Sequence, residues 1–195
     1  MANKSTRKTD YKKKQWYNII APDMFNQIVI GETLAVEPKK LIGRTVETTV
    51  GELINDLSKQ NIKLKFKIDK VSGDSAYTKF IGHQLTHAYI HSLVKRKTSR
   101  IDTNVNVKTQ DGYTVRVKPS CFTMKRARTS QTKQIRKIMK EFIIKRASEL
   151  ELSKFLEESV NGKLAANIFK EVKNIYPPRR VEIRKTEIKA EPIKE

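Results

Sequence analysis

The sequence predicts an α+β fold, in which an antiparallel, barrel-like β-sheet is followed by a C-terminal helical segment and a final strand. Three observations predict it. Residues 15–122 contain several short β-branched or alternating runs, residues 130–175 carry apolar residues at helical spacing, and residues 179–188 alternate again. We expect residues 15–188 to form a single domain between a disordered basic N-terminal tail, residues 1–14, and a C-terminal tail, residues 189–195.

Two hairpins define the β-rich part. Residues 62–68 alternate four apolar residues with three lysines, which is the pattern of a strand with one buried face. Gly73-Asp74 then turns the chain, so that residues 76–81 can return as the partner strand. Gln110-Asp111-Gly112 lies between the alternating runs 105–109 and 113–117, and an Asp-Gly in that position is a strong hairpin signal.

Residues 45–50 form a β-branched run between two glycines and predict a further strand. One helix is expected to interrupt the strands, from about Leu85 to Lys97. Its buried stripe would consist of Leu85, Ala88, Tyr89 and Leu93.

Three helices are expected after residue 129. Ser130 is the predicted N-cap of the first, and its apolar stripe would consist of Ile135, Ile138, Met139, Phe142 and Ile143. A second helix from about residue 150 should end at Asn161-Gly162, and a third should start at about Lys163 and stop before Tyr176-Pro177-Pro178.

Charge is the most informative property of the composition. Lys and Arg number 41 against 21 Asp and Glu, so the formal net charge is +20. A polyanion relieves the resulting repulsion, because each neutralised phosphate releases condensed counterions. A membrane-spanning role is excluded because there is no apolar run of the required length. The single cysteine excludes an internal disulfide framework and indicates a reducing, cytoplasmic location.

The densest basic stretch spans residues 125–146, where Glu141 is the one acidic residue. A solvated helix face usually alternates charges to form i,i+4 pairs, and this face does not. We therefore expect a helix whose cations follow a phosphate backbone; the alternative is an idle charged surface. The candidate RNA-binding residues of this stretch are Lys125, Arg126, Arg128, Lys133, Arg136, Lys137 and Lys140.

The N-terminal segment combines lysines with aromatic residues. Lys12, Lys13 and Lys14 could neutralise phosphates, and Trp16 and Tyr17 could stack on unpaired bases. The alternative, which applies to Trp16 in particular, is that the aromatic side chain packs on the core and anchors the tail.

The expected middle helix ends in a second basic group, consisting of Lys95, Arg96, Lys97 and Arg100. Cations there also complement the helix dipole, but four within six residues exceed what capping requires, so we include them as RNA-binding candidates. Further candidates of the same kind are Arg44, Arg179, Arg180 and Arg184.

His83, His87 and His91 are the three histidines of the chain, and on a helix they would share one face. Such a face could bind a transition metal, which is the alternative function that we consider. Three positions in a line surround a tetrahedral ion poorly, and no glycine-rich phosphate loop or nucleophile motif is present. We therefore expect no enzyme activity, no cofactor, no resident metal and no small-molecule substrate.

A series of short motifs follows in a characteristic order. They are KQWYNIIAP at 14–22 with Met24-Phe25, IGET at 30–33, LIGR at 41–44, Leu85-Thr86, SLVKR at 92–96, VKTQDGY at 107–113 with Arg116, Ser130-Gln131, IRKIM at 135–139, IYP at 175–177, and Val181, Ile183 and Arg184-Lys185. In their number and order they resemble the small-subunit ribosomal proteins of archaea and eukaryotes known as the S-three-A-e, or eukaryotic-type S-one, family. The family commonly has Arg or another polar residue at positions 87 and 91, which argues further against zinc.

The resemblance covers about residues 13–186 and implies a structural protein of the small ribosomal subunit, on the platform near the messenger exit. The implied partners are small-subunit ribosomal RNA, neighbouring small-subunit proteins and messenger RNA near the exit. The C-terminal tail is short beside those of eukaryotic members, so we expect an archaeal, ribosome-bound protein of the cytoplasm. The alternatives are the metal-binding protein above, or a non-ribosomal binder of nucleic acid.

Overall fold

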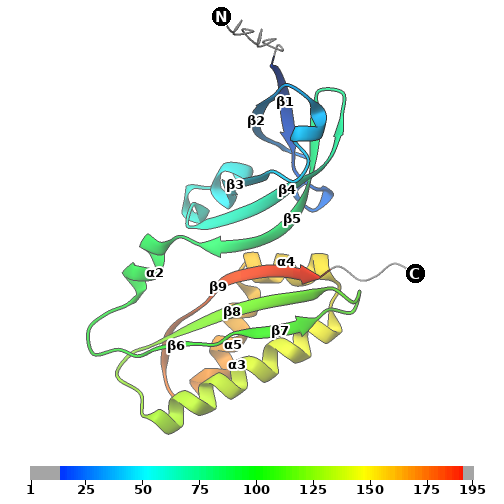
Figure 1. The fold of residues 1–195 in the computed structure, drawn as a ribbon. Helices are drawn as coiled ribbons and strands as arrows, with labels where there is room; N and C mark the ends of the chain where they lie inside the picture. The colour runs from blue at the N-terminus through cyan, green and yellow to red at the C-terminus, as the bar shows by residue number, and fades with distance from the viewer. Residues whose placement is uncertain (1–13, 191–195) are drawn as a thin grey trace, which may run out of the picture. The chain divides into compact units, whose positions relative to one another are not determined.

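The computed structural model describes residues 14–190 (Figure 1). Its strands are β1 (Gln15–Ile20), β2 (Val29–Ala35), β3 (Thr45–Thr49), β4 (Ile62–Ser72), β5 (Ser75–Leu85), β6 (Arg100–Asp102), β7 (Val105–Lys108), β8 (Thr114–Thr123) and β9 (Pro178–Ala190). Its helices are α1 (Val50–Ile54), α2 (His87–Leu93), α3 (Thr129–Glu149), α4 (Leu152–Val160) and α5 (Lys163–Lys173), with short 3₁₀ turns at Asp23–Phe25, Pro38–Lys40 and Leu57–Lys59. The predicted α+β class with a C-terminal helical segment and a final strand is confirmed.

The described chain forms two compact units. The first contains residues 14–46 and Lys67–Lys79, and the second contains Glu47–Phe66 and residues 80–190. The long strands β4 and β5 contribute residues to both units. Apart from Lys14, the predicted tail of residues 1–14 lies outside the described residues.

In the first unit, β1 pairs antiparallel with β2 and parallel with the beginning of β5, so the sheet is mixed rather than purely antiparallel. Its core consists of Tyr17, Ala35, Leu41, Ile68 and Ala76. Gly73 adopts the left-handed conformation that the tight turn between β4 and β5 requires, with φ at 55°. The predicted turn at Gly73-Asp74 is therefore confirmed.

The second unit is built on β8, which pairs antiparallel with β6, β7 and β9. The β7–β8 hairpin has the predicted position, with Val105 opposite Val117 and Lys108 opposite Thr114. Helices α3 and α5 pack on one face of this sheet (Figure 1). In α3 the buried positions are Ile135, Met139, Ile143 and Ala147, while Ile138 and Phe142 pack at the edge of the core.

The helical boundaries depart from expectation at three places. Residue Val50 begins α1 rather than ending a strand, because Thr49 and Glu52 form a reciprocal capping box. The middle helix is limited to His87–Leu93, since Leu85 belongs to β5; Ala88 is exposed and Ile90 is buried. The first long helix begins at Thr129, so Ser130 lies inside it and not at its cap.

Strands β5 and β9 cross closely at Gly82, which lies opposite Glu187. A side chain at position 82 would overlap the carbonyl oxygen of Thr186. Glycine is therefore required at position 82, because the backbones of β5 and β9 approach closely there. The next residue, His83, is buried.

Candidate nucleic-acid interface

Two of the predicted basic segments are joined by a group of hydrogen bonds around Ser99. The Ser99 backbone N–H donates to Thr123 Oγ1 over 2.9 Å, and the Thr123 N–H donates to the Ser99 carbonyl over 3.0 Å. The Ala127 N–H donates to Ser99 Oγ over 3.0 Å. The chain that follows α2 is thus fixed beside the chain that leads into α3.

A third basic segment, at the beginning of β9, joins the same place. The Met124 N–H donates to the Pro177 carbonyl over 3.3 Å, and the Tyr176 hydroxyl donates to the Arg126 carbonyl over 3.4 Å. Within the sheet, Phe122 lies opposite both Arg100 of β6 and Arg180 of β9. Three segments that are far apart in the sequence therefore meet at one end of β6, β8 and β9.

We refer to the cations of these three segments as the basic corner. Most are exposed, and Arg179 is half-buried. The basic corner consists of Lys95, Arg96, Lys97, Arg100, Lys125, Arg126, Arg128, Arg179 and Arg180.

Two arginines of the basic corner are held in place by carboxylates. The Arg100 guanidinium contacts Asp102 Oδ2 at 2.9 Å, and the Ser120 hydroxyl donates to Asp102 Oδ1 over 2.6 Å. Burial opposes the ionised carboxylate, but the hydrogen bonds from Arg100 and Ser120 outweigh it and lower the pKa of Asp102. Arg180 Nε contacts Glu182 Oε1 at 2.7 Å, and this hydrogen bond raises the pKa of Arg180. Both arginines are therefore pre-positioned on the sheet.

Helix α3 extends the basic corner. We refer to Lys133, Arg136, Lys137 and Lys140 as the α3 stripe; all four are exposed, opposite the buried face of the helix. Arg136 Nε donates to the Asp102 carbonyl over 3.3 Å, which ties the stripe to the end of β6. Lys137 lies 3.8 Å from Glu141, but both side chains are exposed, so this pair stabilises the helix little. The stripe is thus attached to β6, the strand that carries Arg100, and we refer to corner and stripe together as the basic surface.

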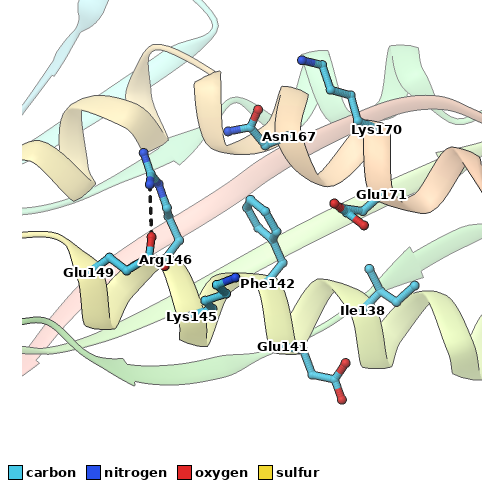
Figure 2. A pocket seen from close by; sticks show the side chains of 9 residues that line it. All are labelled: Ile138, Glu141, Phe142, Lys145, Arg146, Glu149, Asn167, Lys170 and Glu171. Atoms are coloured by element: carbon cyan, nitrogen blue, oxygen red, sulfur yellow. Dashed lines mark hydrogen bonds and ion pairs between the residues drawn. The ribbon is translucent and has the colours of Figure 1, made fainter.

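Beyond the α3 stripe the charges are balanced. Arg146 makes two hydrogen bonds to Glu158, at 3.0 and 2.6 Å, and a third to Glu149. It lies in a groove of about 620 Å³ between α3 and α5 (Figure 2). This groove is lined by three carboxylates and three cations, which are Glu141, Glu149 and Glu171 and Lys145, Arg146 and Lys170. A polyanion would gain little electrostatic binding free energy in this groove, so the basic surface ends at Lys140.

Four other predicted site residues lie in the first unit, away from this surface in the sequence. Arg44 is used structurally, because its guanidinium donates to the carbonyls of Lys40 and Leu34. Trp16 and Tyr17 have opposite environments: the exposed fraction of Trp16 is 60% and that of Tyr17 is 2%. Trp16 therefore does not anchor the tail on the core, whereas Tyr17 does pack in the core and has no free face for stacking. Lys14 is exposed, and Lys12 and Lys13 lie outside the described residues.

The three histidines do not share a helix face. His83 lies in β5 and is buried, with Nε2 3.1 Å from the Ile183 carbonyl and Nδ1 2.7 Å from Thr186 Oγ1. His87 begins α2, and His91 lies one turn later. Both ring nitrogens of His83 already have partners, so the predicted alternative of a three-histidine metal site is not supported by the geometry. Over residues 14–190 no cluster of three potential metal ligands is found among His, Cys, Asp and Glu.

Cys121 is buried in the core of the second unit, where burial raises the pKa of its thiol to about 12. The thiol is therefore protonated at neutral pH and is not an activated nucleophile. Among residues 14–190 no helix has the length and apolar character needed to cross a bilayer.

Comparison with known proteins shows to which family the chain belongs. The model of the Ribosomal S3Ae family matches residues 2–192 of the chain. This chain belongs to the Ribosomal S3Ae family. The resemblance found in the sequence motifs is thereby confirmed over almost the whole chain.

Similar members of the Ribosomal S3Ae family come from archaea. A protein named small ribosomal subunit protein eS1 from Methanothrix thermoacetophila is 59% identical over 193 residues, which cover 98% of this chain and 92% of the relative. The protein of the same name from Archaeoglobus fulgidus is 50% identical over 187 residues, covering 95% and 89%. That from Haloarcula marismortui is 45% identical over 181 residues, covering 93% and 85%.

In this family member, one group of charges was not predicted from the sequence. Glu187 of β9 is surrounded by three lysines, with its carboxylate 2.5 Å from Lys185, 3.0 Å from Lys189 and 3.8 Å from Lys118. The hydrogen bond from Lys185 is the largest influence, and the pKa of Glu187 is lowered to about 2. Arg184, the remaining predicted site residue, is half-buried in the same strand. The sequence did contain a signal for this sheet face. Arg116 and Lys118 alternate with Val115 and Val117, so the two cations lie on the opposite face of the strand from the two valines.

Proposed function

We propose that this chain is a structural constituent of the small ribosomal subunit, acts in translation without catalysing a reaction, and binds ribosomal RNA through the basic corner and the α3 stripe. The relatives named small ribosomal subunit protein eS1 support the ribosomal role. The observation that carries the RNA-binding surface is the convergence of three basic segments at one end of β6, β8 and β9, and their continuation into α3.

The proposed mechanism is neutralisation of phosphates by cations held at fixed spacing. From Lys133 to Lys140 the α3 stripe extends for about 10 Å along the helix axis. The opposite face of α3 is packed in the core, so the helix cannot rotate its cations away. A-form RNA exposes phosphates and 2′-hydroxyls rather than a readable major groove, so a surface of this kind recognises shape more than sequence.

The proposed location within the subunit is the one that the family resemblance implies. We propose that the protein lies on the platform near the messenger exit, in ribosomes of the cytoplasm, with neighbouring ribosomal proteins and messenger RNA within reach. The exposed Trp16, next to the lysines at positions 12–14, supports a nucleic-acid contact of the N-terminal segment, because an exposed indole can stack on an unpaired base. Lys12, Lys13, Arg44 and Arg184 remain weaker candidates for RNA contact.

The RNA-binding surface is tested by changing Lys133, Lys137 and Lys140 together to Gln. Arg136 is retained because it bonds to the Asp102 carbonyl. Binding to small-subunit RNA should weaken, and the slope of log K against log salt should fall by up to about 3, since each phosphate contact contributes roughly 0.9. Salt titration between about 50 and 200 mM measures this slope for both proteins.

The matched control removes the same charge elsewhere in the second unit. Lys108, Lys154 and Lys163 are exposed and lie outside the basic corner and the α3 stripe. Changing these three to Gln should leave most of the salt slope in place. If the salt slope falls equally in the two triple variants, only net charge matters, and the assigned surface is refuted. Unfolding of the first variant alone would show that the stripe is structural.

A further inference from the structure

A second groove of the second unit has a different character from the one in Figure 2. It has a volume of about 780 Å³ and is lined by residues of the Leu57–Lys59 turn, the beginning of β4, the end of β5, α2, α4, α5 and β9. Five cations line it, namely Lys59, Lys170, Lys173, Arg179 and Arg180, against the single carboxylate Glu182. Its formal charge is therefore +4, the difference between these five and one.

The single carboxylate is already occupied. Glu182 Oε1 accepts a hydrogen bond from the Tyr89 hydroxyl over 3.0 Å and contacts Arg180 Nε at 2.7 Å. These bonds fix the Tyr89 ring at the groove wall. Burial, and then the negative charge of Glu182, raise the pKa of Tyr89, so its hydroxyl remains a donor at neutral pH. Glu182 is therefore not available to neutralise the other cations of the groove.

The same groove also offers apolar and amide surface. Tyr89 and Phe169 line it and are only partly buried, and Ile62 and Leu85 also line it. Asn61 and Asn161 add side-chain amides. Gly162, Ala165 and Ala166 form part of the α5 wall, where their small size leaves the space open. Aromatic rings, amides and cations together match the three parts of a nucleotide: base face, base edge and phosphate.

We propose that this groove binds a single unpaired nucleotide of RNA, extruded from its helix. The proposal rests on the RNA-binding function proposed above. Arg179 and Arg180 belong both to the groove and to the basic corner, so a strand lying on the corner leads directly into the groove. The base stacks on Tyr89, and its phosphates contact Arg179, Arg180 and Lys173. An acidic peptide would use the cations but would leave the aromatic surface without a matching partner.

The experiment compares two hairpin RNAs that differ only in one bulged nucleotide, using the full chain. Wild-type protein should bind the bulged hairpin about tenfold more tightly, since stacking of one base on an aromatic side chain is worth roughly that factor or more. With 2-aminopurine as the bulged base, binding should quench its fluorescence. Tyr89→Leu should remove most of the preference, whereas Tyr89→Phe, which retains the ring, should keep it.

A second variant guards against misfolding of the first. Ala166 is exposed on α5 at the groove wall, so Ala166→Leu fills the groove without disturbing the core, and leucine is well accepted in a helix. It should abolish the preference and leave affinity for the unbulged hairpin unchanged. The triple variant at Lys133, Lys137 and Lys140 should weaken both hairpins equally and keep their ratio.

The outcomes separate this inference from the proposed function. If wild-type protein binds both hairpins tightly and equally, the groove does not bind an extruded nucleotide, although RNA binding stands. If neither hairpin binds, both proposals fail. If a poly-glutamate peptide removes the preference and binds the Ala166→Leu variant more weakly than wild type, the groove is a peptide site and the inference is wrong.

Discussion

At the scale of single residues, His83 shows how one buried polar side chain is accommodated. Its ring donates from Nε2 to the Ile183 carbonyl over 3.1 Å, because a carbonyl can only accept. Nδ1 must then accept from the Thr186 hydroxyl at 2.7 Å, and Thr186 Oγ1 in turn accepts from the His83 backbone N–H. This closed network joins β5 to β9 and holds the imidazole neutral. Burial lowers the pKa of His83 from 6.5 to about 4.

The lowered pKa predicts how stability depends on pH. The unfolded chain binds the proton more tightly than the folded one, so His83 contributes its stability fully above pH 6.5 and loses it as the pH falls toward 4. Between pH 7 and 5 the free energy of unfolding should fall by about 2 kcal/mol through this group. Urea titrations at the two pH values measure the change.

The control for this prediction is a histidine variant that cannot titrate. His83→Gln should remove most of the difference between pH 7 and 5, whatever it does to the stability at either value. His91→Gln, at an exposed position of α2, should retain it. A decline of the same size in the His83→Gln protein would mean that another group is responsible.

Residue-scale environments were only partly predictable from the sequence. Trp16 and Tyr17 are neighbours of similar character, and the pattern alone gave no reason to place one inside and the other outside. Their opposite exposure follows from β1, in which successive side chains point to opposite faces. Once β1 is known to begin at Gln15, the burial of Tyr17 and Ile19 follows.

At the scale of elements, the hairpin of β7 and β8 does more than reverse the chain. Asp111 lies in the predicted Asp-Gly turn, and its Oδ2 accepts a hydrogen bond from the Leu152 backbone N–H over 2.9 Å. Leu152 is the first residue of α4, so the turn caps a helix that begins about 40 residues later in the chain. The Gln110 N–H also donates to the Leu150 carbonyl over 3.2 Å.

This cap predicts a measurable cost for Asp111→Ala. Losing the acceptor at a helix N-terminus should reduce the free energy of unfolding by about 1 kcal/mol. Asp111→Asn retains a side-chain oxygen, so its free energy of unfolding should fall by only part of this amount. Thermal or urea unfolding of the three proteins is sufficient to compare them. If Asp111→Ala and Asp111→Asn are both as stable as wild type, the hydrogen bond to Leu152 contributes nothing.

The elements themselves were largely predictable, and the failures have identifiable causes. The alternation in residues 62–68 and the apolar spacing of α3 and α5 are strong signals, and both were confirmed. Helix α1 was missed although Thr49 and Glu52 have the spacing of a capping box, because the β-branched run before them dominated the interpretation. The middle helix was predicted too long because the pairing of β5 with β9, a long-range contact, extends β5 to Leu85.

At the scale of the whole molecule, the charge excess becomes informative only once the chain is folded. The sequence shows three separate basic segments, and their hydrogen bonds to Ser99, Thr123 and Pro177 bring them together. No local pattern could have predicted that convergence, because it depends on the register of β6, β8 and β9. The basic groove is a still clearer case: its cations come from α5, β9 and the Leu57–Lys59 turn.

The net charge of +20 also makes a polyanion a favourable partner for the folded chain. Exposed cations that repel one another destabilise the compact state, and phosphate neutralisation removes that repulsion. We therefore expect small-subunit RNA to raise the melting temperature of the isolated protein at low salt, and this increase to shrink as salt screens the charges. A melting temperature that RNA does not change at any salt concentration would contradict this.

The most direct test of the central claim is to sediment a cell extract through a density gradient and locate this protein. The account predicts that it travels with the small ribosomal subunit at moderate salt, and that the triple variant at Lys133, Lys137 and Lys140 shifts toward the top of the gradient. Wild-type protein that remains at the top, apart from ribosomal particles, would contradict the account.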